Sequence, residues 1–259
     1  MTFVIIGGGI DLSVGSLLAF AGSVGIIAMN HCDNPALAVA VAIVVSIAVG
    51  ASCGALNGAL ITVGKIPPFI VTLGTLSIFR SLTLYIANAG LLTSKHDLFA
   101  RFGGAIILGI PLPAWLLLVL AIIGAIILQQ TRLGRYICAV GSNERVARYA
   151  AINTNLIKFS TYVIAGFLAG ISAVMLGGRL SSLSSTTAGL SYELDAIAAA
   201  IIGGTAMAGG RGSVIGTLAG ALILGIVSNV LDMWGVSVNL QGTVKGVVII
   251  IAVLIQRQR

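Results

Sequence analysis

The stretch ALAVAVAIVVSIAVGASCGALNGALITV, residues 36–63, decides the class of fold of this chain. It contains no Asp, Glu, Lys or Arg. A helix needs roughly 20 apolar residues to cross the hydrocarbon core of a bilayer, so this run is long enough to cross it. Because the run is apolar on every side, it predicts a helix packed in a bundle and not an amphipathic surface helix.

The composition of the whole chain agrees with a membrane protein. Of the 259 residues, 58% are hydrophobic and 8% are charged, whereas soluble domains carry about 25% charged residues. So little polar surface cannot coat a water-facing globule, which excludes a soluble enzyme. The net charge is +7, but the 14 basic residues are spread among apolar runs. They form no continuous basic stripe, which excludes nucleic acid as a partner.

Eight runs in total are long and apolar enough to predict transmembrane helices. They cover residues 12–29, 36–63, 66–92, 104–128, 159–178, 192–210, 213–232 and 238–256. A shorter apolar segment, residues 2–10, predicts a partial helix before them. The predicted fold is therefore all-α, a polytopic membrane helix bundle that forms a single transmembrane domain over residues 1–259.

The distribution of Lys and Arg predicts the orientation. The longest polar interval, residues 129–158, carries Arg132, Arg135, Arg145, Arg148 and Lys158 against the single acid Glu144. Cytoplasmic loops are enriched in Lys and Arg, so we expect this interval in the cytoplasm. Alternation of the helices then places Lys65, Arg211 and the C-terminus inside as well, and nine of the 14 basic residues become cytoplasmic.

This orientation leaves the partial helix at the N-terminus incomplete. It must descend from the outside, but nine residues rise only about 13.5 Å, less than half of the hydrocarbon core. The segment has no basic flank and is not a signal peptide. We expect that the chain is truncated or that its start is misassigned, and that the full-length protein has ten crossings with both ends inside.

Glycines spaced by four residues predict close helix packing. Gly50, Gly54 and Gly58 share one helix face, and Gly216 and Gly220 repeat the pattern. Such faces let two helix backbones approach closely. They fit packing within the chain or a seam between two copies of it.

The sequence holds no recognisable catalytic, metal or nucleotide site. Cys32, Cys53 and Cys138 lack CxxC spacing, and no HExxH motif is present. The glycine-rich residues 203–213 do not fit the register of a phosphate-binding loop and predict a tight interhelical turn. We therefore expect no cofactor on this chain and no enzymatic activity of its own.

Polar residues inside apolar runs are candidates for a solute path, because such residues are costly in a membrane. The candidates are Asp11, Ser13, Asn57, Arg80, Asn229 and Gln241. They suit hydrogen bonding to a neutral polyhydroxy solute. Hydrogen bonds between helices, or Arg80 and Lys245 capping carbonyls or pairing with an acid, explain them equally well. No chain of acids lies in mid-membrane, which disfavours a proton-coupled pump.

The basic interval contains a predicted short helix. Asn143 can cap it, Glu144 lies in its first turn, and it extends to about Ala151. A short helix between two membrane spans suits docking of a cytosolic protein. A plain positively charged loop beside anionic lipid is the alternative.

Four motifs together resemble a known family. They are GGIDLSVGS at residues 8–16, KIPPFIVTL at 65–73 continuing to Arg80, TRLGRY at 131–136 with residues 143–153, and YELDAIA at 192–198 continuing into the glycines at 203–204 and 209–210. The chain resembles the permease subunits of bacterial ABC importers for monosaccharides, the ribose-type group, which is related to the branched-chain amino acid permeases.

The resemblance implies a multi-pass subunit in the bacterial plasma membrane with a cytoplasmic C-terminus. A second permease copy or paralogue, an extracytoplasmic sugar-binding protein and cytosolic ATPase subunits would be its partners, with ATP and Mg used by the ATPase. Its coupling-loop residues correspond here to Arg135, Asn143, Glu144, Arg145, Ala147, Arg148, Tyr149, Ala151, Ile152 and Asn153. This chain departs from the family pattern in two places. Arg145 and Val146 replace two alanines, and Ala151 stands where glycine is common.

Two other classes of protein compete with this interpretation. A stand-alone carrier or channel would need no ATPase, and a membrane enzyme would need convergent catalytic groups. The sequence does not name the sugar, because ribose, allose, xylose, galactose and autoinducer-type furanoses are served by related permeases.

Overall fold

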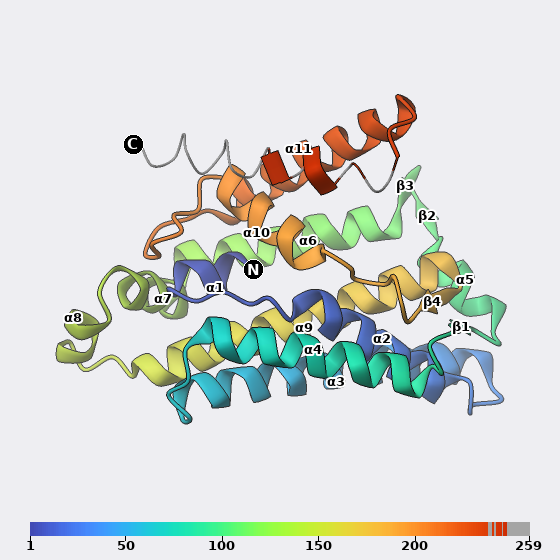
Figure 1. Ribbon diagram of the computed structural model, residues 1–259, viewed down its shortest axis with the longest axis horizontal. Coiled ribbons are helices and arrows are strands. Elements are labelled where there is room, and N and C mark those ends of the chain that lie inside the picture. Colours follow the sequence, from blue (N-terminus) through green and yellow to red (C-terminus); the bar gives the residue numbers. More distant parts are fainter. Residues whose placement is uncertain (238–239, 241, 245, 248–259) are drawn as a thin grey trace. The chain divides into compact units, whose positions relative to one another are not determined.

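The computed structural model describes residues 1–237, 240, 242–244 and 246–247 (Figure 1). Most of the predicted crossing 238–256, including Gln241 and Lys245, lies outside the described residues.

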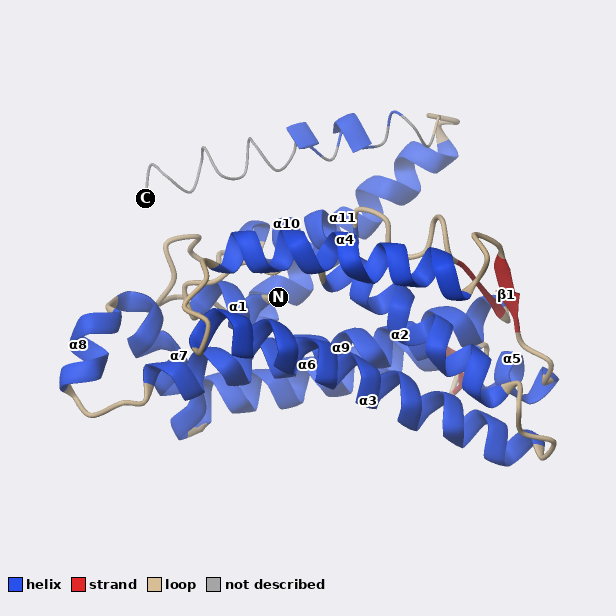
Figure 2. Ribbon diagram, turned by 60° about the horizontal axis from the view of Figure 1, so that its bottom comes forward, coloured by secondary structure: helices blue, strands red, loops and turns tan. Residues whose placement is uncertain are grey.

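Helices dominate the described part of the chain (Figures 1 and 2). Five of them are long and apolar enough to cross a membrane: α3 (Pro35–Thr62), α4 (Pro68–Ile86), α6 (Leu112–Gln130), α9 (Thr154–Leu180) and α11 (Val214–Met233). The shorter helices are α1 (Thr2–Ile6), α2 (Val14–Met29), α5 (Asp97–Gly103), α7 (Arg132–Ser142), α8 (Glu144–Tyr149) and α10 (Tyr192–Ile202). The strands are β1 (Leu91–Thr93), β2 (Ile106–Ile107), β3 (Ile110–Pro111) and β4 (Ser182–Ser184). The predicted all-α membrane class is confirmed, and the full number of crossings stays a prediction.

Local sequence sets where the long helices begin and end. The Asn34 side chain caps α3 by accepting a hydrogen bond of 2.9 Å from the Ala36 amide, and Pro35 occupies the first helical turn. Pro68 similarly begins α4, which ends before Asn88 and Ala89, both in the left-handed conformation. α6 begins later than the predicted residue 104 because the hairpin β2–β3 precedes it.

The helix of one predicted crossing is shorter than expected. Residues 192–210 were expected to span the membrane, but α10 has 11 residues, a rise of about 16.5 Å against a core of about 30 Å. The helix ends at Ile202, and Gly204, Gly209 and Gly210 adopt positive φ in the segment that follows. The glycines end the helix because they make a turn more favourable than continued helix. The expected tight turn at 203–213 is therefore present.

The chain forms two compact units. Unit A comprises residues 10–120 and 158–193, and unit B comprises residues 1–9, 121–157 and 194–259. Each is described separately below.

Unit A is built around α2, which packs against α3 and α4, with α9 alongside α3. A Cβ atom on Gly50 or on Gly166 would collide with the backbone oxygen of the other residue, and Gly54 lies equally close to the Tyr162 carbonyl. The glycine face of α3 is thus covered by α9 of the same chain. Packing within the chain is the correct interpretation of Gly50, Gly54 and Gly58.

One end of unit A carries its small sheets (Figure 1). β1 and β4 pair antiparallel, with Leu92 opposite Leu183. Asn30, at the C-terminal end of α2, donates a hydrogen bond of 2.9 Å to the Thr93 carbonyl and accepts one of 2.9 Å from the Lys95 amide. These bonds fix the sheet to the end of α2.

Unit B contains α1, α7, α8, α10, α11 and the second half of α6. Gly203 packs on Gly216, and Gly220 packs on the Ala199 carbonyl, so the second glycine pattern also serves packing within the chain. The Gly210 amide donates a 2.8 Å hydrogen bond to the Ile6 carbonyl, which attaches the turn after α10 to α1.

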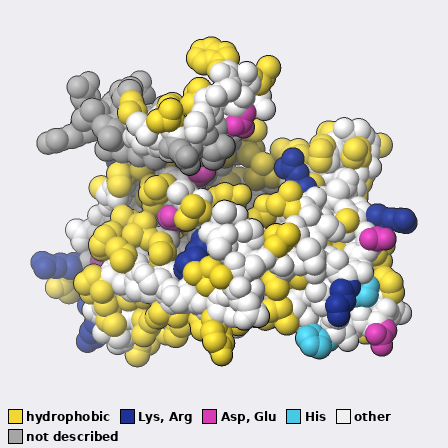
Figure 3. Space-filling view, turned by 45° about the vertical axis from the view of Figure 1, so that its right-hand side comes forward, with side chains coloured by type: hydrophobic (Ala, Val, Ile, Leu, Met, Phe, Trp, Pro, Cys, Tyr) yellow, Lys and Arg dark blue, Asp and Glu magenta, His cyan; other side chains and the backbone are white. Residues whose placement is uncertain are grey.

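Hydrophobic side chains cover much of the visible surface, and charged side chains occur in small separate groups (Figure 3). Leu117, Leu118 and Val119 are consecutive exposed residues of α6. A soluble monomer rarely exposes extended apolar surface, so these side chains suit contact with lipid.

Candidate functional site

The basic interval begins with a sharp turn from α6 into α7. The Thr131 hydroxyl donates a 2.6 Å hydrogen bond to the Ile127 carbonyl, and its oxygen accepts one of 3.3 Å from the Gly134 amide at the start of α7. A side chain on Gly134 would collide with the Leu128 carbonyl. The TRLGRY motif therefore serves to fold the chain back after α6.

Helix α7 is amphipathic. Gly134, Ile137 and Val140 are buried on one face, and Arg132 and Arg135 are exposed. The sequence analysis missed this helix and expected only the shorter one that follows. The spacing of three residues between the buried positions was the available signal, because it places them on one side of a helix. Arg135 lies on the solvent side of α7.

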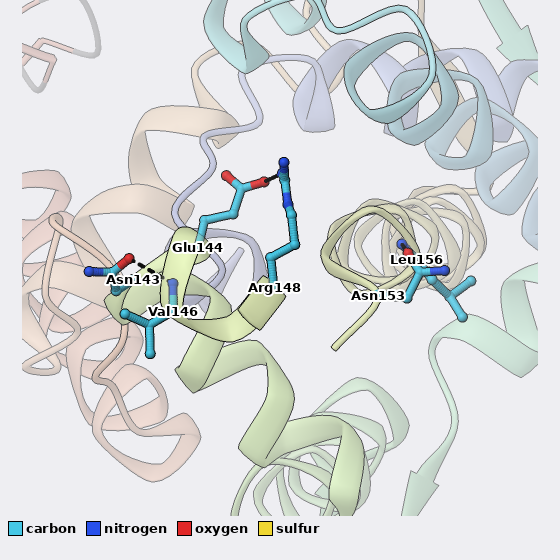
Figure 4. A network of polar contacts seen from close by, with 6 residues as sticks. All are labelled: Asn143, Glu144, Val146, Arg148, Asn153 and Leu156. Carbon is cyan, nitrogen blue, oxygen red and sulfur yellow. Dashed lines mark hydrogen bonds and ion pairs between the residues drawn. The ribbon is translucent and has the colours of Figure 1, made fainter. Parts of the chain in front are cut away.

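Helix α8 has the predicted N-terminus (Figure 4). The Asn143 side chain accepts a 3.1 Å hydrogen bond from the Val146 amide, and Glu144 lies in the first turn. Glu144 also pairs with Arg148 one turn later at 2.9 Å. The pair is exposed, so it contributes at most about 0.5 kcal/mol to the stability of the helix.

The outer face of α8 is apolar and basic. The Tyr149 side chain is 90% exposed and that of Val146 is 61% exposed, whereas Ala147 is buried. Arg145 is exposed on the same short helix. Exposed Tyr and Arg beside an aliphatic side chain are typical of protein-binding surfaces.

A Schellman motif ends α8. The Ile152 amide donates to the Ala147 carbonyl and the Ala151 amide donates to the Arg148 carbonyl, both at 3.1 Å. Ala151 has φ +61°, a left-handed conformation in which glycine is favoured. A glycine at this position would adopt the same conformation without the steric cost of an alanine Cβ. Asn153 then caps α9, accepting a 3.1 Å hydrogen bond from the Leu156 amide (Figure 4).

Three of the candidate path residues lie together in unit A. The Ser13 hydroxyl donates a 2.6 Å hydrogen bond to Asp11 and accepts one of 2.8 Å from the Asn57 side chain of α3. All three residues are buried, and neither Asp11 Oδ2 nor Asn57 Oδ1 has a hydrogen-bond partner among the described residues. The cluster joins the segment before α2 to α3.

The other candidates are separate from this cluster. Arg80 on α4 donates a 3.1 Å hydrogen bond to the Ser185 carbonyl. Asn229 is exposed on α11 of unit B, and Gln241 lies outside the described residues. The structure therefore brings together Asp11, Ser13 and Asn57, and a role of any candidate in solute transport stays a prediction.

No cluster of three or more His, Cys, Asp or Glu residues suited to a metal ion is present in the described part of the chain. Burial raises the pKa of the Cys138 thiol on α7. A raised thiol pKa disfavours the nucleophilic thiolate at neutral pH.

Comparison with known proteins gives the family. The family described as "Branched-chain amino acid transport system / permease component" matches residues 1–253. The ribose import permease protein RbsC of Escherichia coli K12 is 43% identical over 263 residues, which cover 100% of this chain and 80% of that protein. RbsC of Bacillus subtilis 168 is 45% identical over 261 residues, with the same coverage.

A third relative, the D-allose transport system permease protein AlsC of E. coli K12, is 38% identical over 255 residues, covering 98% of this chain and 77% of that protein. No solved structure matches the chain. The family match extends over nearly the whole chain and includes every motif that carried the resemblance. This chain therefore belongs to the branched-chain amino acid transport system / permease component family and is a membrane permease.

Proposed function

We propose that this chain is the transmembrane subunit of an ABC importer that moves a ribose-like monosaccharide into a bacterial cell. The observation that carries the proposal is 43–45% identity to two ribose import permeases over the full length of this chain. The long apolar helices and the ordered basic interval between α6 and α9 support it.

The proposed docking site for cytosolic ATPase subunits is the exposed face of α8 with the exposed side of α7. Val146 and Tyr149 supply apolar contact area, and Arg145 supplies charge. ATP and Mg are bound and used by the ATPase. This chain contributes the surface against which the ATPase subunits move.

The ends of α8 suit the transmission of movement. The Schellman turn after Tyr149 leads in two residues to Asn153, the cap of α9. Ala147 is buried, so α8 is held on the protein as well as exposed to a partner. A displacement of α8 by the ATPase is thereby passed to α9, a 27-residue helix, and switches the permease between outward- and inward-facing states.

The other proposed partners follow from the same function. An extracytoplasmic binding protein delivers the sugar at the end of unit A that carries β1 and β4, and a second permease copy or paralogue completes the pore. Basic residues of the loop lie near anionic lipid. The protein resides in the plasma membrane with its C-terminus in the cytoplasm.

ATP hydrolysis by the reconstituted complex tests the proposal. We expect a binding protein loaded with ribose to stimulate hydrolysis more than the same binding protein without sugar. Sugar uptake that persists when the ATPase subunits are removed would show instead a stand-alone carrier or channel.

A further inference from the structure

The chain between β4 and α10 is rich in hydroxyl groups and is not helical. Five of the eight residues in the segment 184–191 carry a hydroxyl: Ser184, Ser185, Thr186, Thr187 and Ser191. We call these eight residues the hydroxyl segment. It begins at Ser184, the last residue of β4, and ends just before α10, which begins at Tyr192. The whole segment belongs to unit A.

The hydroxyl segment extends deep along α2. At the sheet end, Asn30 bonds to the Thr93 carbonyl. Near the other end of the hydroxyl segment, Gly189 lies so close to Gly15 that a Cβ on either residue would collide with the backbone oxygen of the other. Along α2, Gly15 lies about 22 Å from Asn30, most of the thickness of the hydrocarbon core. The segment therefore carries irregular backbone to membrane depth.

One side of the segment is fixed to unit A. Ser185 is buried, its hydroxyl donates a 2.8 Å hydrogen bond to the Gly90 carbonyl, and its own carbonyl accepts the hydrogen bond from Arg80. The hydroxyls of Ser184 and Thr186 are hydrogen-bonded to each other at 3.0 Å, and the Ser184 hydroxyl accepts a hydrogen bond of 3.3 Å from the Thr187 amide. These contacts hold the segment in one conformation.

The other side is exposed and carries hydroxyl groups, with one apolar residue, Leu190, exposed beside them. Thr186 and Thr187 are exposed, and the Thr187 hydroxyl makes no hydrogen bond to the described residues. Arg80 lies beside them, since it donates a hydrogen bond to the Ser185 carbonyl. Irregular, polar backbone at membrane depth is tolerated only where it is buried in protein or lines a water-filled cavity. The exposed side is therefore unsuited to lipid.

We propose that the hydroxyl segment lines the aqueous path of the solute, and that the hydroxyls of Thr186 and Thr187 bind its hydroxyl groups. The proposal rests on the proposed function and names residues that the sequence analysis did not select. A threonine hydroxyl both donates and accepts, so it matches a neutral polyhydroxy solute in many orientations. Such bonds are individually weak, which allows the solute to leave again.

Cysteine labelling of the complete transporter tests this placement. In a background with Cys32, Cys53 and Cys138 changed to Ala, Thr187→Cys should react with a membrane-impermeant, positively charged methanethiosulfonate reagent added outside intact cells. Two controls should not react: Ala188→Cys, which is buried in the same segment, and Leu117→Cys, which is exposed on the apolar side of α6. Sugar-loaded binding protein with ATP should change the rate at which Thr187→Cys reacts with the reagent.

Two labelling results would overturn the proposal. One is no reaction of Thr187→Cys, both at rest and during ATP turnover. The other is a disulfide between the Thr187→Cys residues of two permease copies, which would place the segment in a seam between them.

A second set of variants tests contact with the sugar. Thr187→Val keeps the shape and removes the hydroxyl, so sugar uptake should fall about fivefold, the factor that one neutral hydrogen bond contributes. Thr187→Ser should retain uptake, and binding-protein-stimulated ATP hydrolysis should persist in both variants. Equal uptake by Thr187→Val and the unsubstituted protein would overturn the proposed contact. Failure of the unsubstituted complex to take up any monosaccharide would instead overturn the proposed function, and the labelling result would still decide whether the segment faces water.

Discussion

At the scale of single residues, two positions show how backbone geometry and burial constrain the chain. Ala151 adopts a left-handed conformation at the end of α8, and Ser13 lies in a buried network with Asp11 and Asn57. The first carries a conformational cost in the folded protein. The second would leave unsatisfied polar atoms if its hydroxyl were removed. The two positions therefore respond to substitution in opposite directions.

We expect Ala151→Gly to stabilise the end of α8 by up to about 1 kcal/mol. The left-handed conformation costs alanine about 1–2 kcal/mol, and the larger entropy of glycine in the unfolded chain offsets part of the gain. Hydrogen exchange of the Ala147–Ile152 turn should slow. The control is Ala150→Gly, because Ala150 has φ −81° and gains nothing from glycine. Equal loss of protection in both variants would contradict this explanation.

We expect Ser13→Ala to destabilise the protein by about 1–3 kcal/mol, because it removes the donor to Asp11 and the acceptor of Asn57 in a buried site. Thermal unfolding in detergent measures the change. Ser77→Ala is the matched control, since the Ser77 side chain is exposed and makes only a 3.5 Å contact to the Leu73 carbonyl. An unchanged unfolding temperature for Ser13→Ala would show that the network does not stabilise the fold.

At the scale of helices, close packing and one exposed helix determine what the chain can do. The α3–α9 crossing depends on the absence of side chains at Gly50, Gly54 and Gly166. Helix α8 depends on caps at both of its ends and exposes the residues between them. The α3–α9 crossing holds unit A together, and the exposed residues of α8 are available to a partner.

Gly54→Ala should destabilise the α3–α9 crossing by about 1–3 kcal/mol, because its Cβ would collide with the Tyr162 carbonyl. Gly74→Ala on α4 is the control. Nothing lies within 4 Å of the added Cβ there, and alanine is the better helix former by about 1 kcal/mol. The half-life of each variant in detergent at raised temperature distinguishes the two. If both variants are equally long-lived, the crossing is not tightly packed.

We expect the double variant Arg145→Glu, Arg148→Glu to abolish co-purification of the ATPase subunits and sugar uptake, because it reverses the charge of α8. Insertion into the membrane should be retained, which membrane fractionation checks. Arg101→Glu on α5 makes one such charge reversal outside the basic interval and should leave both properties intact. Retained ATPase binding by the double variant would exclude α8 as the docking site.

At the scale of the whole molecule, the energy source distinguishes an importer subunit from a stand-alone carrier. The Asp11 carboxylate is buried and bonded to Ser13, which accepts a hydrogen bond from Asn57 of helix α3. We expect uptake by cells containing the complete transporter to stop with vanadate, a phosphate analogue that blocks ATPases. Uptake should continue when a protonophore dissipates the proton gradient while ATP is maintained. The opposite pattern would indicate a proton-coupled carrier.

The sequence by itself determined the membrane class, the family and the start of α8. Hydrophobic run length and loop charge are properties of the chain alone, and the capping of α8 by Asn143 is a contact within four residues. For the same reason, Glu144 could be placed in the first turn before the structure was known.

Only the tertiary structure decided what the glycines and polar residues contact. The sequence could not tell packing within the chain from a seam between copies, because both require the same small residues. It predicted a continuous helix over 192–210, since apolar composition does not reveal where glycines end a helix. It also did not indicate Thr186 and Thr187, because the role proposed for them depends on the position of their segment beside α2 at membrane depth. Contacts between residues far apart in the chain decide these points, and no local pattern encodes them.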